Sequence, residues 1–207
     1  MSAKMIVLAG NVGAGKSTYT RILSEKMNFL PYYESVDDNP FLEDFYYDQK
    51  QWSYHLQTYF LFHRFKSIKK IIESGKNAIL DRTIYEDAEI FAKNLHLTGK
   101  MTDKEYSAYR DIFYTMLEFI KKPDLTIYID TNVETIKNRI AKRGRKMEMQ
   151  VPDDYWKQLD RLYKLWISKY NHSNLLIVDG NKNDIVEHEN FVDELIEKIE
   201  NKIYKNA

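Results

Sequence analysis

The sequence predicts an α/β fold in which helices cover both faces of a five-stranded parallel sheet, and three observations support this. Apolar runs of strand length recur along the chain, and longer stretches with helical spacing separate them. Strands that alternate with helices imply parallel pairing, because a parallel crossover needs a helix-length connection. A glycine-rich segment follows the first apolar run. The expected strands are Met5–Ala9, Phe29–Tyr33, Ala78–Leu80, Leu125–Ile129 and Leu175–Val178.

The length and composition favour a single domain over residues 1–207. A chain of 207 residues with 43% hydrophobic and 14% aromatic residues can bury one substantial core. It has only 4 prolines and 7 glycines, and no Ser/Gly-rich or like-charged segment divides it. We therefore expect no linker and no second domain.

The charge balance argues against two classes of partner. The 31 basic and 31 acidic side chains give a formal net charge of zero, so no global field draws the chain to nucleic acid or to a membrane. The chain has no cysteine, which fits a reducing compartment. No apolar stretch approaches the roughly 18 residues of a membrane span, and the N-terminus lacks a secretory or transit pattern. We expect a cytoplasmic protein.

The glycine-rich segment from Gly10 to Ser17 fits the P-loop pattern at every fixed position. Its glycines let backbone N–H groups face phosphate oxygens, and a helix expected to start near Lys16 adds the positive end of its dipole. Lys16 is expected to reach the β- and γ-phosphates, and Ser17 to offer its hydroxyl to Mg²⁺. The pattern predicts binding of ATP or GTP. The predicted binding residues are Gly10, Asn11, Val12, Gly13, Ala14, Gly15, Lys16, Ser17 and Thr18.

Three further helices are expected. Gln49–Ser74 and Thr102–Lys121 lie between strands and are longer than a minimal crossover needs. They can form substrate walls or a dimer face. The last helix, near His188–Tyr204, has apolar residues four apart, which core packing explains.

Acidic residues follow four of the expected strands, where ligands of open α/β sheets gather. They are Glu34, Asp81, Asp130 and Asp179. The pattern alone does not choose which Asp would hold Mg²⁺ through water, but context favours Asp81, because Arg82 and Thr83 follow it directly. The segment Asp130-Thr131-Asn132 has the pattern of a helix N-cap, and we interpret Asp130 as a capping residue.

Four motifs in this order make the chain resemble the deoxyribonucleoside kinases. They are the P-loop, Tyr33-Glu34-Ser35-Val36, Asp81-Arg82-Thr83 and Arg139-x-x-x-Arg143-Gly144-Arg145. From about Lys4 to about Tyr170, the chain is similar to the bacterial deoxyadenosine/deoxyguanosine kinases. Ser35 departs from the many members that have proline there, whereas Asn39-Pro40 is similar to the bacterial branch. The resemblance implies a P-loop kinase fold with three α/β/α layers.

The resemblance also implies catalytic roles. Glu34 occupies the position of the general base for the sugar 5′-hydroxyl, and Arg82 would hold Glu34 or the transferring group. Lys16 completes the predicted catalytic set. Because phosphoryl transfer is mostly positioning and charge stabilisation, Glu34 need only orient the hydroxyl and take its proton late.

The arginines after the fourth strand resemble the family's lid, expected around residues 139–148. Arg139 and Arg143 share one helical face, and Gly144 ends the helix just before Arg145, so all three could close over the phosphates. A solvated basic helix end is the alternative interpretation. By resemblance, Glu148 and Tyr46 would bind the sugar 3′-hydroxyl.

The helix from Gln49 carries Gln57 and Arg64 on one face, because seven residues span nearly two turns. In the family, an amide at the position of Gln57 makes paired hydrogen bonds to the base, and the Arg64 equivalent pairs with an aspartate that matches Asp87. The 5 histidines have no metal-ligand spacing, and we assign them no chemistry.

The sequence therefore predicts an ATP- and Mg²⁺-dependent kinase of purine deoxynucleosides that serves deoxynucleotide salvage, with deoxycytidine as a further candidate substrate. Two alternatives remain open. A nucleoside monophosphate kinase similar to thymidylate kinase would share the P-loop and lid, but Glu34 would repel its anionic substrate. A non-catalytic nucleotide-binding regulatory module would have no use for the residues expected around a second ligand. By resemblance, the chain forms a homodimer.

Overall fold

A computed structural model describes residues 3–34, 39–145, 148, 151–182, 185–186 and 189–204. Its sheet has five parallel strands, as the sequence predicts, and the structure gives their order as β2-β3-β1-β4-β5. Ser35, the departure from the family pattern, lies outside the described residues. The strands are β1 (Met5–Ala9), β2 (Leu30–Tyr32), β3 (Ala78–Asp81), β4 (Leu125–Asp130) and β5 (Asn174–Asp179).

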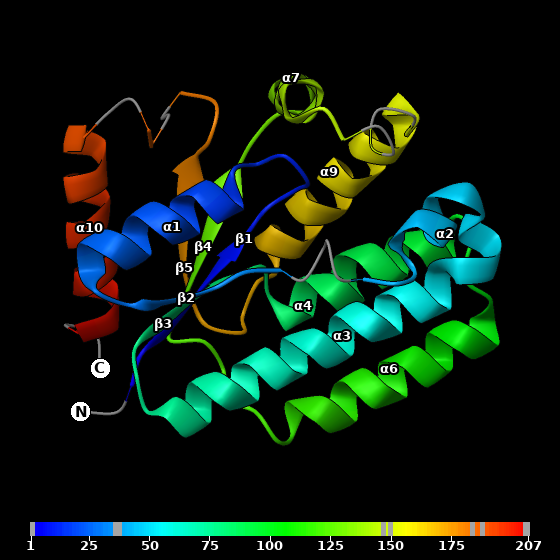
Figure 1. The fold of residues 1–207 in the computed structure, drawn as a ribbon, viewed down its shortest axis with the longest axis horizontal. Helices are drawn as coiled ribbons and strands as arrows, with labels where there is room; N and C mark the ends of the chain where they lie inside the picture. Colours follow the sequence, from blue (N-terminus) through cyan, green and yellow to red (C-terminus); the bar gives the residue numbers. More distant parts are fainter. Residues whose placement is uncertain are drawn as a thin grey trace.

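Helices fill the connections between the strands (Figure 1). Helix α3 has the predicted bounds. The helix predicted over Thr102–Lys121 begins one residue later, because Thr102 is its N-cap, and it ends earlier than predicted, at Leu117, with Glu118 as its C-cap. The start predicted for the last helix, His188, lies outside the described residues. The helices are α1 (Lys16–Met27), α2 (Leu42–Tyr47), α3 (Gln49–Ser74), α4 (Ile84–Glu86), the π-helix η1 (Asp87–Ala92), α5 (Lys93–Leu97), α6 (Asp103–Leu117), α7 (Val133–Arg143), α9 (Asp153–Ser168) and α10 (Glu189–Tyr204).

The three central strands of the sheet, β1, β3 and β4, are buried on both faces, which gives three layers. Met5, Val7 and Ala9 of β1 belong to one buried cluster with side chains of α3, α6 and α9, whereas Ile6 and Leu8 pack with side chains of α1 and α10. This alternation is expected for a parallel strand covered on both sides. Figure 1 shows α1 and α10 on one side of the strands and α3, α6 and α9 on the other. No helix in the described part of the chain is long and apolar enough to cross a membrane.

The prediction that Asp130 caps a helix is wrong. Asp130 is the last residue of β4 and pairs in register with Asp179 of β5, so the strand runs one residue further than its apolar segment. The N-cap of α7 is Asn132, whose Oδ1 accepts a hydrogen bond from the Thr135 N–H at 2.8 Å. Asn132 can cap because its backbone is extended, whereas Asp130 is held in the ladder.

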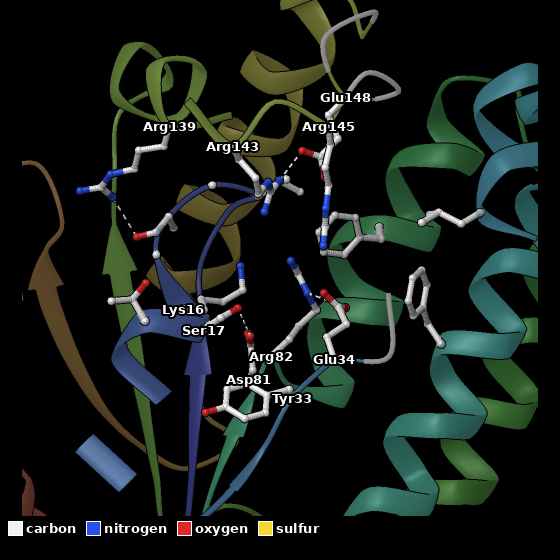
Figure 2. Close-up of a pocket in the computed structure, with 18 of the residues that line it drawn as sticks. Lys16, Ser17, Tyr33, Glu34, Asp81, Arg82, Arg139, Arg143, Arg145 and Glu148 are labelled. Carbon is white, nitrogen blue, oxygen red and sulfur yellow. Dashed lines mark hydrogen bonds and ion pairs between the residues drawn. The ribbon is translucent and has the colours of Figure 1, made fainter. Parts of the chain in front are cut away.

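The strand order determines where a ligand can bind. Strand β1 lies between β3 and β4, so the connections that leave the carboxyl ends of these strands diverge there. In parallel α/β sheets such a divergence opens a crevice beyond the strand ends. The P-loop follows β1, Glu34 lies two residues beyond β2, and Asp81 ends β3. These three features therefore meet at one edge of the sheet (Figure 2).

Candidate active site

The loop between β1 and α1 has the geometry of a phosphate cradle. Gly10, Gly13 and Gly15 adopt φ angles of 148°, 78° and 100°, which favour glycine. A Cβ on Gly10 would lie 2.9 Å from the carbonyl oxygen of Ile129, so a side chain at Gly10 would force the loop away from β4. Gly15 is the N-cap of α1 and precedes Lys16, the first residue of that helix. The loop therefore presents a helix N-terminus to an anion.

Lys16 is buried and folded back onto the loop. Its Nζ donates to the carbonyl oxygens of Gly10 at 2.8 Å and Asn11 at 2.9 Å. Burial, together with the charge of Arg82, lowers the pKa of Lys16 to about 8. A bound polyphosphate would supply the negative charge that favours the ammonium form. Lys16 uses two of its three N–H donors on these carbonyls, so a phosphate can take the third donor or draw the side chain away from the loop.

Ser17 and Asp81 provide a donor set that fits Mg²⁺. The Ser17 hydroxyl donates to Asp81 Oδ2 at 2.5 Å, and the buried Oδ1 of Asp81 has no hydrogen-bond partner among the described residues. The described chain has no cluster of three or more His, Cys, Asp or Glu side chains that could enclose a metal. Magnesium does not need one, because it commonly takes one or two protein oxygens and completes its shell with phosphates and water.

Glu34 is held by two arginines from different elements. Its Oε1 lies 3.0 Å from Arg82 Nε and accepts a hydrogen bond from Arg64 Nη2 at 2.8 Å. Figure 2 shows the Glu34 carboxylate and the Arg82 guanidinium facing each other across from Lys16. Burial alone would raise the pKa of Glu34, but Arg82, Arg64 and Lys16 together lower it to about 2. Glu34 is therefore ionised at neutral pH and positioned as a hydrogen-bond acceptor.

Arg64 lies behind the cavity and supports the groups that line it. Its Nε donates to Asp87 Oδ2 at 3.1 Å, its Nη1 to the backbone oxygen of Asp81 at 2.7 Å, and its Nη2 to Glu34. The expected contact between Arg64 and Asp87 is thus present, and the contact with Glu34 adds to it. Burial raises the pKa of Asp87 to about 6, although Arg64 opposes this shift. Asp87 and Glu34 line the cavity, whereas Arg64 does not.

Arg82 is strained and fixed from several directions. Its φ of 76° is unusual for a residue with a side chain and persists only where the surroundings enforce it. The Arg82 guanidinium carbon lies 4.4 Å from the ring centre of Phe91, and its Nη1 donates to the Tyr163 hydroxyl at 3.0 Å. Its Nη2 has no hydrogen bond to the described part of the chain. That group remains available for a ligand.

Glu86 and Tyr163 belong to the same buried network, and the sequence analysis missed both. Glu86 Oε1 accepts hydrogen bonds from the Gly10 N–H at 3.0 Å and from the Tyr163 hydroxyl at 2.7 Å. Its Oε2 accepts from the Thr83 N–H at 2.8 Å and completes a capping box with the Thr83 side chain. The signal in the sequence was Thr83-x-x-Glu86, a capping-box pattern directly after the third strand. No comparable signal marks Tyr163.

A cavity of about 750 Å³ connects these groups. Gln57, Tyr46 and Glu148 line it, as does every predicted P-loop residue except Gly10 and Asn11. Gln57 is buried, and its Oε1 has no hydrogen-bond partner in the described ranges, so it can accept one from a ligand. The apolar part of the wall, which suits a flat ring, comes from Leu42, Phe45, Leu56, Phe60 and Phe91.

The three arginines of the predicted lid all line the cavity but have different partners. Arg139 donates to the backbone oxygens of Ala14 at 3.0 Å and Gly180 at 2.8 Å, so it braces the P-loop. Arg143 and Arg145 pair with Glu148 instead, and Figure 2 shows these two arginines and Glu148 on one side of the cavity, with Arg139 apart from them. As expected, Gly144 ends α7 in the left-handed conformation.

Comparisons with known proteins agree with this geometry. The family model "Deoxynucleoside kinase" matches residues 6–204. The chain is 40% identical to the deoxyadenosine/deoxycytidine kinase of Bacillus subtilis, over 98% of this chain and 94% of that one. It is 41% identical to a deoxyguanosine kinase of Lactobacillus acidophilus, over 94% and 90% of the two chains. A solved structure of the deoxyadenosine kinase from M. mycoides, with the products dCMP and dCDP bound, has a TM-score of 0.83 at 29% identity and covers 94% of this chain and 98% of that one. The chain therefore belongs to the deoxynucleoside kinase family and is a kinase with the P-loop kinase fold.

Proposed function

We propose that this kinase transfers the γ-phosphate of ATP to the 5′-hydroxyl of a purine deoxynucleoside, deoxyadenosine or deoxyguanosine, and that it also accepts deoxycytidine. The observation that carries this proposal is the position of Glu34. A carboxylate held by Arg82 and Arg64 faces the P-loop lysine across one cavity. A neutral hydroxyl can donate a hydrogen bond to this carboxylate. The similarity to deoxyadenosine and deoxyguanosine kinases supports the choice of a purine deoxynucleoside as substrate.

In the proposed reaction, each group orients or stabilises charge. Glu34 accepts a hydrogen bond from the 5′-hydroxyl and takes its proton late, as the new P–O bond acidifies it. Lys16 and Nη2 of Arg82 offset the charge on the transferring phosphoryl group. If Arg82 shifts toward that group, its hold on Glu34 weakens and the pKa of Glu34 rises as the proton arrives.

Ser17 and Asp81 would hold Mg²⁺, which would supply positive charge to offset the negative charge of the phosphates. The lid would comprise residues 139–148, with Arg143 and Arg145 leaving Glu148 to contact phosphates. Glu148 would then be available, with Tyr46, to bind the sugar 3′-hydroxyl. Gln57 would pair with the base through the carbonyl oxygen that lacks a partner within the described residues. We further propose a single domain, a homodimer and a cytoplasmic location.

An initial-rate assay tests this proposal. Pure protein is given ATP, Mg²⁺ and each of deoxyadenosine, deoxyguanosine, deoxycytidine, thymidine and the corresponding monophosphates. We expect the highest kcat/KM with a purine deoxynucleoside and no transfer to monophosphates. Preference for a monophosphate would favour a nucleoside monophosphate kinase. ATP binding without transfer to any nucleoside would favour a regulatory module.

A further inference from the structure

The Tyr163 hydroxyl joins parts of the site that come from different segments of the chain. It lies 2.9 Å from the Gly10 carbonyl oxygen, 2.7 Å from Glu86 Oε1 and 3.0 Å from Arg82 Nη1. Tyr163 and Glu86 are both 0% exposed, so water does not readily replace a missing partner there. Removal of this hydroxyl would therefore take a hydrogen-bond partner from both the P-loop and Arg82.

Packing holds the Tyr163 ring in place. Its centre lies 6.0 Å from that of Tyr128, 6.3 Å from that of Trp166 and 6.4 Å from that of Phe91. The ring cannot follow a moving partner, but its hydroxyl hydrogen can rotate. The hydroxyl is thus a fixed point with a choice of hydrogen-bond acceptors.

A phenol has one proton, so Tyr163 donates to only one of its two neighbouring acceptors at a time. Arg82 Nη1 donates to the same oxygen and does not compete for that proton. In the structure, the Gly10 carbonyl already accepts from Lys16 Nζ. The phenol proton can then serve Glu86, because a carboxylate is the stronger acceptor. When Lys16 turns toward a phosphate, the Gly10 carbonyl loses its lysine donor.

We propose that Tyr163 is a positioning residue that takes over the Gly10 carbonyl when Lys16 leaves it for a nucleotide. The hydroxyl hydrogen turns from Glu86 to Gly10, and no covalent bond changes. Glu86 is not left unpaired, because it keeps the N–H groups of Gly10 at 3.0 Å and Thr83 at 2.8 Å. The exchange lets Lys16 leave without stranding a buried carbonyl. It rests on the proposed function only in that Lys16 binds phosphate.

The first test compares ATP affinity in Tyr163→Phe and Tyr128→Phe by titration calorimetry with Mg²⁺. Tyr128 is the matched control, since its ring stacks on Tyr163 and its hydroxyl has no hydrogen bond to the described part of the chain. Stranding a buried carbonyl should weaken ATP binding on the order of tenfold in Tyr163→Phe. The ATP affinity of Tyr128→Phe should stay within about twofold of that of the wild type, because this substitution removes no hydrogen bond to the described residues.

The second test repeats Tyr163→Phe in a Lys16→Met background. Without the lysine, Tyr163 serves Gly10 before and after ATP binds, so removing its hydroxyl should change ATP affinity less than about twofold. A merely structural role would give the same loss in both backgrounds, and that result would overturn the exchange. Unchanged ATP affinity in Tyr163→Phe alone would also overturn it, as would a wild-type protein that does not bind ATP.

If Tyr163→Phe does not fold, 3-fluorotyrosine at position 163 keeps the ring and the hydroxyl. Its ¹⁹F resonance should shift when ATP saturates the wild-type protein, and should shift much less in Lys16→Met saturated with ATP. Equal shifts in the two proteins would refute the exchange. Because neither test needs turnover, absence of nucleoside phosphorylation would refute the proposed function separately.

Discussion

Arg64 donates to Glu34 at 2.8 Å, so one guanidinium contacts both the carboxylate proposed as the general base and Asp87, which we propose lies in the nucleoside pocket. Glu34 follows β2 and Arg64 lies in α3, 30 residues further along the chain. The same guanidinium donates to the backbone oxygen of Asp81, the proposed metal residue. The groups proposed for substrate choice and for turnover therefore share one supporting side chain.

This shared support changes what removing the Arg64–Asp87 pair should do. Arg64→Met alone strands Asp87, and Asp87→Ala alone strands a buried arginine charge, so each should reduce activity with every substrate. The double variant should lower turnover with all nucleosides, because Glu34 loses one cation. It should also raise the thymidine-to-purine ratio of kcat/KM at least about tenfold, since the pocket becomes neutral and gains room for a methyl group.

Steady-state kinetics with deoxyadenosine, deoxyguanosine, deoxycytidine and thymidine, on the wild type and all three variants, would check this. An unchanged ratio in the double variant would mean that the pair does not influence base choice. Full turnover in Arg64→Met would mean that Glu34 does not need its second arginine.

The local pattern of the sequence predicts much of this site. The P-loop glycines, Ser17 and the strand-end residues Glu34 and Asp81 follow from short motifs and from the rule that ligands bind beyond strand ends. The alternation of strands with helices predicts the parallel sheet, because a parallel crossover needs a helix-length connection. Each of these features is determined by residues that lie close together in the sequence, so the sequence alone predicts it.

The features that were missed depend on contacts between distant segments. Tyr163 is 153 residues from Gly10, and a buried tyrosine on an amphipathic helix looks like an ordinary core residue. Asp130 was misassigned because its pairing with Asp179 depends on strand register, which the segment around Asp130 does not encode. The π-helix over Asp87–Ala92 has no sequence rule that predicts it.

Glu34→Gln should lower kcat by about 10² to 10⁴, the usual worth of a general base, and change KM values only several-fold. The amide oxygen can still accept from Arg82 and Arg64, so the geometry is retained, but the amide cannot take the proton. Glu118→Gln, an exposed carboxylate at the end of α6, is the control and should match the wild type. Near-normal turnover of pure Glu34→Gln would remove Glu34 from its proposed role.

The lowered pKa of Glu34 should also affect how the stability and the activity of the protein depend on pH. A carboxylate with a lowered pKa stabilises the fold above its unfolded pKa, and that stability is lost as pH falls toward the folded value of about 2. Activity should therefore show no acid limb from Glu34 between pH 8 and pH 5. In Arg64→Met one of the cations is missing, so the limb should move upward. A limb near the ordinary glutamate pKa in the wild type would contradict the two-arginine environment.

Asp81→Asn should raise the Mg²⁺ concentration needed for half-maximal rate by about tenfold or more, because an amide is a weaker ligand than a carboxylate for this hard cation. Asp130→Asn is the matched control, since Asp130 also ends a parallel strand but does not line the cavity. The measurement is initial rate against free Mg²⁺ at saturating ATP and nucleoside. A shift in Asp130→Asn with none in Asp81→Asn would reverse the assignment.

Lys16 should make ATP binding take up a proton. Its pKa is about 8 in the free protein because burial and Arg82 disfavour its charge, and triphosphate oxygens should raise that pKa. At pH 9 most of the free protein should have a neutral Lys16, so ATP binding should take up much more of a proton at pH 9 than at pH 7. Unfolded lysine keeps its proton to higher pH, so the same group makes stability rise between pH 8 and 10.5. Calorimetry of ATP binding in two buffers of different ionisation enthalpy measures the uptake directly. Lys16→Met should abolish the rise between pH 7 and pH 9, whereas equal uptake in the variant would assign the proton to another group and leave Lys16 charged throughout.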